Sequence, residues 1–208
     1  MLTLGIESSC DDTCVAILDK VDAGTSAAAV SPLGTQAQLH FHDKITAVNT
    51  DHGGIHPIVS LESHWANLAN LLDRSLRHLP DASLQAQEAH KVHLKDGSIK
   101  QKPDFISVTR GPGMRSNLVC GLDTAKGLST AWQIPMVGVH HMQAHALTPR
   151  LVHALEHRFT DTIFQPSFPF LTLLISGGHT MLLHSQSLVS HSIIANTRDI
   201  AIGDCLDK

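Results

Sequence analysis

Short apolar stretches alternate with longer amphipathic stretches along most of this chain. Residues 57–76 place apolar side chains at every third or fourth position, which predicts a helix that ends near residues 79–80. Residues 117–132 and 142–157 also have helical patterns. Strands are predicted at the apolar stretches between these segments, at residues 2–6, 13–18, 37–41, 104–109, 135–140, 170–175 and 180–184. Strands that alternate with helices predict an α/β domain.

The composition supports a folded domain and excludes several classes of protein. The chain has 208 residues, 42% of them hydrophobic, which is enough for a core in one large or two small domains. No apolar run approaches the roughly 18 residues that span a bilayer, and we expect no targeting segment at the start. Four cysteines without CxxC spacing favour a reducing compartment.

Residues 81–103 are expected to form an exposed connection with a short helix near residues 85–91.

Two segments far apart in the sequence have the same strand–turn–strand pattern. Residues 2–9 and 171–178 both begin with an apolar strand and continue into a turn of small or hydroxyl residues. This repeat predicts a duplicated domain whose second copy has only begun, although two unrelated β-hairpins would also look alike. We expect a first lobe over residues 1–135 and the start of a second lobe over residues 136–208.

The turns at residues 7–12 and 176–179 are candidate anion sites because small and hydroxyl residues let backbone N–H groups approach a phosphate. The first turn carries three carboxylates, which repel phosphate unless a cation intervenes or unless they orient a reacting group. A solvated hairpin turn is the alternative. The second turn has no carboxylate and follows an apolar strand, which favours a nucleotide-contacting loop. Neither turn fits the P-loop or the Rossmann pattern.

The Gly-Pro-Gly sequence at residues 111–113 lies between a predicted strand and the start of a predicted helix. Ligands of α/β sheets bind at such strand ends, and a helix N-terminus favours anions. Glycine and proline also suit a tight turn that binds nothing. Both interpretations stay open at this stage.

His141 and His145 are candidate metal ligands. Four residues apart on a helix, they lie on one face, and they follow a predicted strand directly. The spacing alone is weak evidence because the chain has 16 histidines and two other pairs have the same spacing. A zinc peptidase is disfavoured because no Glu follows the first histidine to activate water, and a third ligand must come from elsewhere.

Five motifs occur in order along the chain: residues 5–13, 111–113, 140–145, 175–180 and 203–208. Together they resemble the tRNA adenosine threonylcarbamoyltransferases, once labelled O-sialoglycoprotein endopeptidases. The first and last motifs read Gly-Ile-Glu-Ser-Ser-Cys-Asp-Asp-Thr and Gly-Asp-Cys-Leu-Asp-Lys. The Gly-Met-Arg-Ser sequence at residues 113–116 and the last motif resemble the mitochondrial, fungal-type branch.

The resemblance implies the actin/Hsp70-like (ASKHA) duplicated α/β fold, present here as the first lobe and the start of the second. It implies transfer of a threonylcarbamoyl group from threonylcarbamoyl-adenylate to N6 of the adenosine next to the anticodon, in tRNAs that read codons starting with A. Relatives continue past this point and supply an Asp as a third metal ligand, so we expect a C-terminally truncated chain. A mitochondrial location is implied, with a cytoplasmic one as the alternative.

The motifs also assign roles to residues of this chain. The resemblance implies that His141 and His145 ligate one divalent metal ion, zinc or iron. It implies that Ser9, Asp11 and Asp12 line the reacting end, where a carboxylate can orient or deprotonate the attacking amine. Adenylate binding is implied for Ile175, Ser176, Gly177, Gly178 and His179, with Asp207 on the ribose.

The expected partners are tRNA, threonylcarbamoyl-adenylate and a second copy of the chain in a homodimer, with no membrane. The net charge of −4 does not favour tRNA binding by this segment, so we expect tRNA to bind mainly through parts outside it. Three other functions stay open: an inactive interaction module, a metal-dependent peptidase, and a sugar-kinase-like phosphotransferase.

Overall fold

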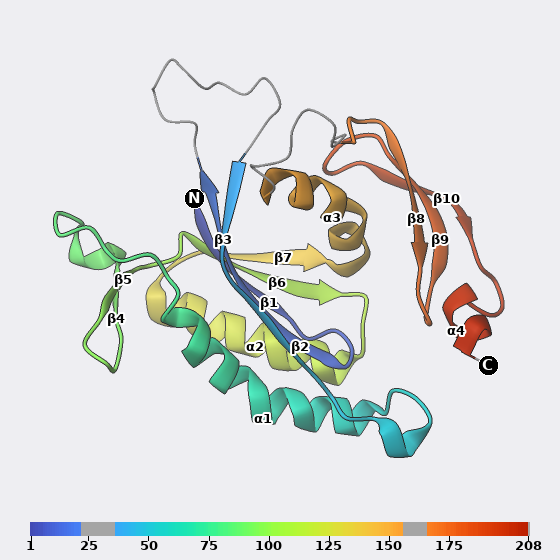
Figure 1. The fold of residues 1–208 in the computed structure, drawn as a ribbon, viewed down its shortest axis with the longest axis horizontal. Helices are drawn as coiled ribbons and strands as arrows, with labels where there is room; N and C mark the ends of the chain where they lie inside the picture. Colours follow the sequence, from blue (N-terminus) through green and yellow to red (C-terminus); the bar gives the residue numbers. More distant parts are fainter. Residues whose placement is uncertain (22–35, 156–165, 208) are drawn as a thin grey trace. The chain divides into compact units, whose positions relative to one another are not determined.

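The computed structural model describes residues 1–21, 36–155 and 166–207 (Figure 1). Contacts divide the chain into two compact units, Met1–His141 and Met142–Lys208. This division rests on contacts alone, and the division into lobes between residues 135 and 136 stays a prediction.

A mixed five-stranded sheet forms the first unit, in the order β3-β2-β1-β6-β7. β1, β2 and β3 pair antiparallel, whereas β1, β6 and β7 pair parallel. This sheet confirms the predicted α/β class, and three antiparallel strands followed by two parallel ones are the arrangement expected of an actin/Hsp70-like lobe. The strand bounds are β1 (Leu2–Glu7), β2 (Asp12–Val21), β3 (Gln36–Thr46), β6 (Phe105–Gly111) and β7 (Met136–His140).

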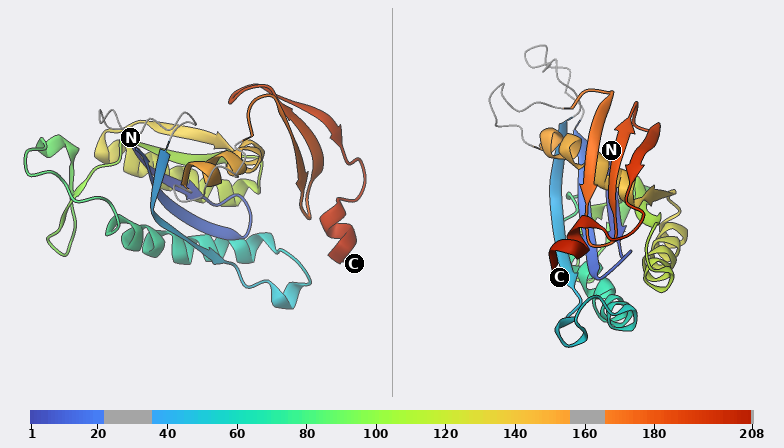
Figure 2. Two further views of the ribbon diagram at one scale, coloured as in Figure 1. Left: turned by 45° about the horizontal axis from the view of Figure 1, so that its top comes forward. Right: turned by 90° about the vertical axis from the view of Figure 1, so that its right-hand side faces the viewer.

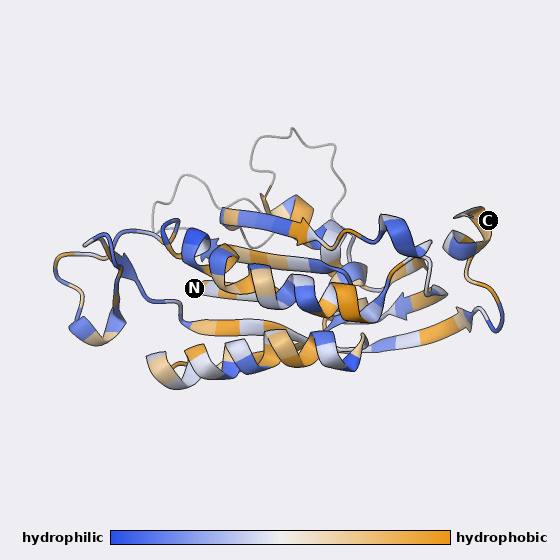
Figure 3. Cartoon of the chain, turned by 90° about the horizontal axis from the view of Figure 1, so that it is seen from below, coloured by the Kyte–Doolittle hydropathy of each residue, from blue (hydrophilic) through white to orange (hydrophobic). Residues whose placement is uncertain are grey.

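Two long helices, α1 (Pro57–Leu76) and α2 (Arg115–Trp132), pack on one face of this sheet (Figures 1 and 2). The hydropathy colouring of Figure 3 shows apolar and polar residues mixed along the helices, as expected of elements with one buried face. α1 ends before the predicted residues 79–80. Tighter three-residue turns replace its helical hydrogen bonds there, from the Leu79 N–H to the Leu76 carbonyl among others. A single turn of 3-10 helix, η1 (Thr50–His52), precedes α1.

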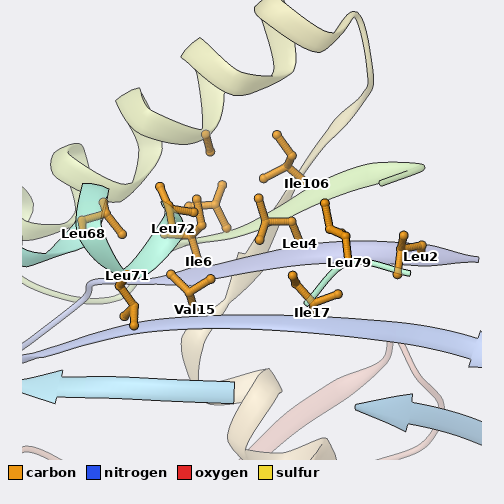
Figure 4. Packing of buried hydrophobic residues seen from close by; sticks show 12 residues of the cluster. Leu2, Leu4, Ile6, Val15, Ile17, Leu68, Leu71, Leu72, Leu79 and Ile106 are labelled. Atoms are coloured by element: carbon orange, nitrogen blue, oxygen red, sulfur yellow. The ribbon is translucent and has the colours of Figure 1, made fainter. Parts of the chain in front are cut away.

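The main core lies between this sheet and its two helices (Figure 4). Every second side chain of β1 is buried, because successive residues of a strand point to opposite faces. Leu4 and Ile106 on neighbouring strands are fully buried and meet Leu71 of α1 in the same cluster. Burial of a leucine side chain contributes about 1.5–3 kcal/mol, so this layer holds the first unit together.

The segment at residues 81–103 differs from its prediction. It contains a hairpin of β4 (Lys91–His93) and β5 (Ile99–Gln101), and the predicted short helix is reduced to one 3-10 turn, η2 (Glu88–His90). An Asp-Gly turn closes the hairpin, with Gly97 at φ 85°. The Ser98 N–H donates to the Asp96 side chain at 2.9 Å.

The second unit contains a three-stranded antiparallel sheet in the order β10-β9-β8. α3 contacts this sheet through a small apolar cluster, in which Met142 and Ala146 of α3 meet Met181 and Leu183 of β9. The predicted strands β8 and β9 are confirmed, whereas β10 and α4 were not predicted. Residues 156–157 of the predicted third helix lie outside the described residues. The element bounds are α3 (His141–Leu155), β8 (Phe170–Ile175), β9 (Thr180–Ser185), β10 (His191–Asn196) and α4 (Ile202–Asp207).

The longest helices in the described part of the chain are the amphipathic α1 and α2 of the first unit. Within the described ranges, no helix is both long and apolar enough to cross a membrane.

Two glycines of α2 provide a matched test of this packing. A Cβ at Gly121 would collide with Oγ of Ser8 and come within 3.4 Å of Cγ2 of Ile6, whereas one at Gly127 would meet nothing. We expect Gly121→Ala to lower the free energy of unfolding by about 1–3 kcal/mol. Gly127→Ala should raise it by about 0.5–1 kcal/mol, because alanine favours a helix. Urea denaturation followed by circular dichroism measures both, and equal effects of the two substitutions would contradict the packing.

Candidate functional site

A polar cluster lies where the parallel strands of the first unit end. Glu7 is the last residue of β1, Thr109 is near the end of β6, and His141 follows β7 directly. The carboxyl ends of parallel strands meet at one edge of a sheet, and that edge is where α/β proteins bind ligands. The register places these three residues together although they are far apart in the sequence.

Hydrogen bonds connect the members of this cluster. The Ser9 N–H donates to Oε1 of Glu7 at 2.5 Å, and the Thr109 hydroxyl donates to Oε2. The Ser9 hydroxyl lies 3.2 Å from Nδ1 of His141, and the same nitrogen lies 3.5 Å from Oε2 of Glu7. The structure therefore brings together two residues that the sequence assigned to separate roles, Ser9 and His141.

Glu7 is ionised in this setting. Burial raises the pKa of its carboxyl, but hydrogen bonds from His141, Ser9 and Thr109 outweigh burial and hold the pKa at about 2. A fixed negative charge therefore lies beside the imidazole of His141.

This charge orients the His141 ring. Metal-binding histidines characteristically use one ring nitrogen for the metal and the other for a carboxylate or carbonyl. Because Nδ1 faces Glu7 and Ser9, coordination by His141 would use Nε2. His145 lies one helical turn further along α3, in the second unit. Among the described residues, no group of three or more metal-ligating side chains is assembled.

The two aspartates of the β1–β2 turn differ in their surroundings. Asp12 accepts hydrogen bonds from Lys44 at 2.8 Å and from the Thr46 hydroxyl at 2.5 Å. Burial raises the pKa of Asp12, but these two donors lower it further than burial raises it. Asp11 makes no ion pair within the described part of the chain, and its carbonyl accepts from the Ala47 N–H at 2.9 Å. Among the described residues, Asp12 therefore has a cationic partner and Asp11 has none.

The Gly-Pro-Gly turn packs tightly against Ser9. A Cβ at Gly113 would lie 2.6 Å from the Ser9 carbonyl oxygen, closer than side-chain carbons approach backbone atoms. The Met114 N–H donates to that same oxygen at 2.8 Å. The tight-turn interpretation therefore has a specific reason in the structure, namely close approach to the Ser9 backbone.

The second predicted site lies in the second unit. Ile175 ends β8, and the exposed turn of residues 176–179 follows, closed by a 2.8 Å hydrogen bond from the Ser176 N–H to the His179 carbonyl. No described residue lies within 4 Å of a Cβ placed on either glycine of the turn, so these residues leave its backbone open to a ligand. Gly203 of α4 packs on this turn, since a Cβ there would lie 2.5 Å from the Ser176 carbonyl carbon. Asp207 ends α4, and its side chain lies outside the described part.

Glu7 and Thr109 are the site residues that the sequence did not assign. Glu7 was visible as one of three carboxylates in the first turn, but nothing in the sequence separates it from Asp12. The distinction arises from register: β1 pairs with β6 on one side and with β2 on the other. The Glu7 side chain is thereby bonded across to β6 and the Asp12 side chain to β3.

The two cysteines of this region are unsuited to nucleophilic chemistry. Burial, followed by the charges of Asp12 and Glu7, raises the pKa of Cys14 to about 12. Burial and the neighbouring Asp11 charge raise the pKa of Cys10 as well. Because the thiolate is the nucleophile, the raised pKa lowers the thiolate fraction of both residues at neutral pH.

The mixed sheet and the polar cluster at its strand ends define an α/β protein whose candidate ligand site lies at that edge. The TsaD family model, described as tRNA N6-adenosine threonylcarbamoyltransferase, matches residues 40–208. The chain belongs to this family, which confirms the resemblance seen in its motifs.

Individual relatives cover the whole chain. The mitochondrial tRNA N6-adenosine threonylcarbamoyltransferase of Schizosaccharomyces pombe is 38% identical over 100% of this chain and 42% of its own length. The enzyme of the same name from Burkholderia vietnamiensis is 33% identical over 100% of this chain and 49% of its own length. The chain thus spans less than half the length of these relatives.

The matches among solved structures are more distant in sequence. YeaZ from Pseudomonas aeruginosa has a TM-score of 0.44 at 13% identity, over 96% of this chain and 71% of that one. A Ppx/GppA family member from Aquifex aeolicus has a TM-score of 0.44 at 8% identity, over 99% of this chain and 53% of that one.

Thiol reactivity tests the environment of the first turn. With a pKa of about 12, Cys14 has a thiolate fraction about 1000-fold below that of an ordinary thiol. We expect iodoacetamide at pH 8 to modify exposed Cys205 while native Cys14 stays unmodified. Peptide mass mapping measures both sites, and guanidinium-unfolded protein, in which both react, is the control. Equal rates at both sites in the native protein would contradict the burial of Cys14.

Proposed function

We propose that this chain forms the first half of the catalytic site of a mitochondrial tRNA N6-adenosine threonylcarbamoyltransferase. The observation that carries the proposal is the contact of Glu7 and Ser9 with Nδ1 of His141. It orients an imidazole at the ligand-binding edge of a sheet. Membership of the TsaD family and the mitochondrial fungal relative support the choice of reaction and compartment.

The reaction is an acyl transfer in which N6 of adenosine attacks the carbamoyl carbon of threonylcarbamoyl-adenylate. A new C–N bond forms, the C–O bond to the phosphate breaks, and AMP leaves with the bonding electrons. N6 loses one proton, and because an exocyclic base amine is a poor nucleophile, a carboxylate near it accelerates attack. We assign this role to Asp11, because Asp12 is paired with Lys44.

The residues present fit one half of a metal site. His141, through Nε2, and His145 would hold a divalent ion, zinc or iron, and an Asp from beyond this segment would complete the set. When bound, the ion polarises the carbamoyl carbonyl or holds the adenylate phosphate. Glu7 keeps the His141 ring in the orientation and tautomer that this coordination requires.

The second unit would hold the nucleotide. The backbone of residues 176–179 is open to a ligand and carries no acidic side chain, so the adenylate would lie against this turn, with Asp207 on its ribose. We propose that residues 1–135 belong to the first lobe and that residues 136–208 begin the second. The anticodon region of tRNA would be bound mainly by cationic surface outside this segment, since the net charge here is −4.

A homodimer is the proposed assembly. A groove of about 900 Å³ runs between α1 and α2 and is lined by apolar Pro57, Leu61, Trp65 and Val119. Trp65 is 66% exposed. Large exposed apolar side chains beside a groove are typical of protein–protein contacts, so this face would meet a second copy.

An interaction module without activity is the second candidate function. Leu171 and Leu173 on one face of β8 are each 61% exposed. An exposed apolar face of this kind is typical of protein–protein interaction sites. Activity of the full-length gene product decides between the two candidates, because only the transferase forms a modified nucleoside.

Substitution of His141 tests the proposed transferase function. We expect His141→Ala to lower threonylcarbamoyl transfer by the full-length gene product by more than 100-fold, and Ser9→Ala, which removes a partner of the ring, by about 10- to 100-fold. Mass spectrometry of nucleosides from tRNA incubated with threonylcarbamoyl-adenylate measures the product. His93→Ala is the matched control, because His93 is an exposed histidine on β4. Activity of His141→Ala within twofold of the unsubstituted protein would refute the assignment.

A further inference from the structure

Two fully buried polar side chains converge on the turn that carries Ser9. His64 of α1 and Asn117 of α2 are both 0% exposed. Nε2 of His64 lies 2.9 Å from the Cys10 carbonyl oxygen, and Nδ2 of Asn117 donates to the same oxygen at 2.5 Å. One backbone carbonyl therefore receives donors from both helices.

The acceptor fixes the state of the histidine. A carbonyl oxygen only accepts hydrogen bonds, so Nε2 of His64 must carry the hydrogen. In the neutral ring, Nδ1 then accepts, and its partner is the Thr13 hydroxyl at 2.7 Å. His64 thus joins the Cys10 carbonyl, within the turn, to Thr13, the second residue of β2.

Neighbouring groups leave the turn little freedom. The Ser9 and Asp11 carbonyls accept from the Met114 and Ala47 N–H groups at 2.8 and 2.9 Å. Both lone pairs of the Cys10 carbonyl are used, and the peptide unit is planar, so the plane between Cys10 and Asp11 is fixed. This plane includes Cα of Cys10 and Cα of Asp11, and Ser9 is the residue before it.

We propose that His64 and Asn117 are positioning residues of the transferase: they hold the Cys10 carbonyl and thereby fix the Ser9 hydroxyl against Nδ1 of His141. This inference rests on the proposed function. Neither residue touches the cluster itself, and both act through the turn. Their chemistry supports the role, because an apolar side chain would fill the same space without the cost of a buried donor.

The substitutions separate donor chemistry from packing. His64→Leu and Asn117→Leu remove one donor each, from opposite helices. In His64→Gln, the side-chain amide can still donate to the Cys10 carbonyl and accept from Thr13. Ser75→Ala is the matched control, because Ser75 is a buried polar residue of α1 whose hydroxyl donates to the Leu72 carbonyl of its own helix.

Hydrogen exchange of the full-length gene product, resolved to the Ser9 and Met114 amides, measures the turn directly. We expect exchange at least about tenfold faster in His64→Leu and in Asn117→Leu, and rates within threefold of the unsubstituted protein in His64→Gln and Ser75→Ala. Unchanged exchange in either leucine variant overturns the proposal. Equal acceleration in His64→Gln and His64→Leu overturns it as well, since the donor would then be irrelevant. If one leucine variant does not fold, the other tests the proposal.

Zinc affinity connects the turn to the metal site. Competition with a chromophoric chelator should show about 10- to 100-fold weaker zinc binding in both leucine variants, recovered in His64→Gln. Loss of zinc binding by Ser75→Ala to the same extent would contradict a specific role. The two readouts also separate the proposals. If the unsubstituted protein transfers no threonylcarbamoyl group, the proposed function fails, whereas the exchange data still decide whether the two residues fix the turn.

Discussion

A carboxylate that loses part of its contact with water needs hydrogen bonds in exchange, and half-buried Glu7 receives them from several elements. Its partners come from the β1–β2 turn, from β6 and from the start of α3. Their convergence depends on parallel pairing of β1, β6 and β7 in one register. A shift of one residue in that register would point the Thr109 hydroxyl to the opposite face of the sheet. The ionised state of Glu7 and the orientation of His141 therefore follow from strand pairing.

The helices contribute to this edge in a second way. α1 and α2 bury apolar side chains against the sheet, and each also sends one buried polar side chain to the turn after β1. At Gly113 and Gly121 the missing side chain lets the chain pack against Ser9 and Ser8. The same two helices, α1 and α2, therefore stabilise the first unit and hold the turn of the candidate site in place.

The sequence predicts most strands and helices because apolar periodicity is strong in them. The β4–β5 hairpin was missed because its short strands include Lys91 and Lys100, and its closure depends on the turn at Gly97. In the site, motifs identify Ser9 and His141, but they group Asp12 with Ser9. In the structure, Asp12 forms an ion pair with Lys44 of β3. The cross-strand neighbour of Asp12 is Thr46, two residues after Lys44. The register between β2 and β3 determines that ion pair, and the sequence alone does not reveal this register.

The close approach of Gly203 to the turn after β8 limits how short a fragment of this chain can be if the turn is to keep its support. The hydrogen bonds of this turn are local. Its backbone also packs against Gly203 of α4, a helix that follows β9 and β10 in the sequence. A proteolytic cut or a gene fragment ending between β10 and α4 would keep all three strands of that sheet. It would nevertheless remove the surface against which Ser176 rests. The smallest fragment that preserves the supported turn must therefore extend through residue 203.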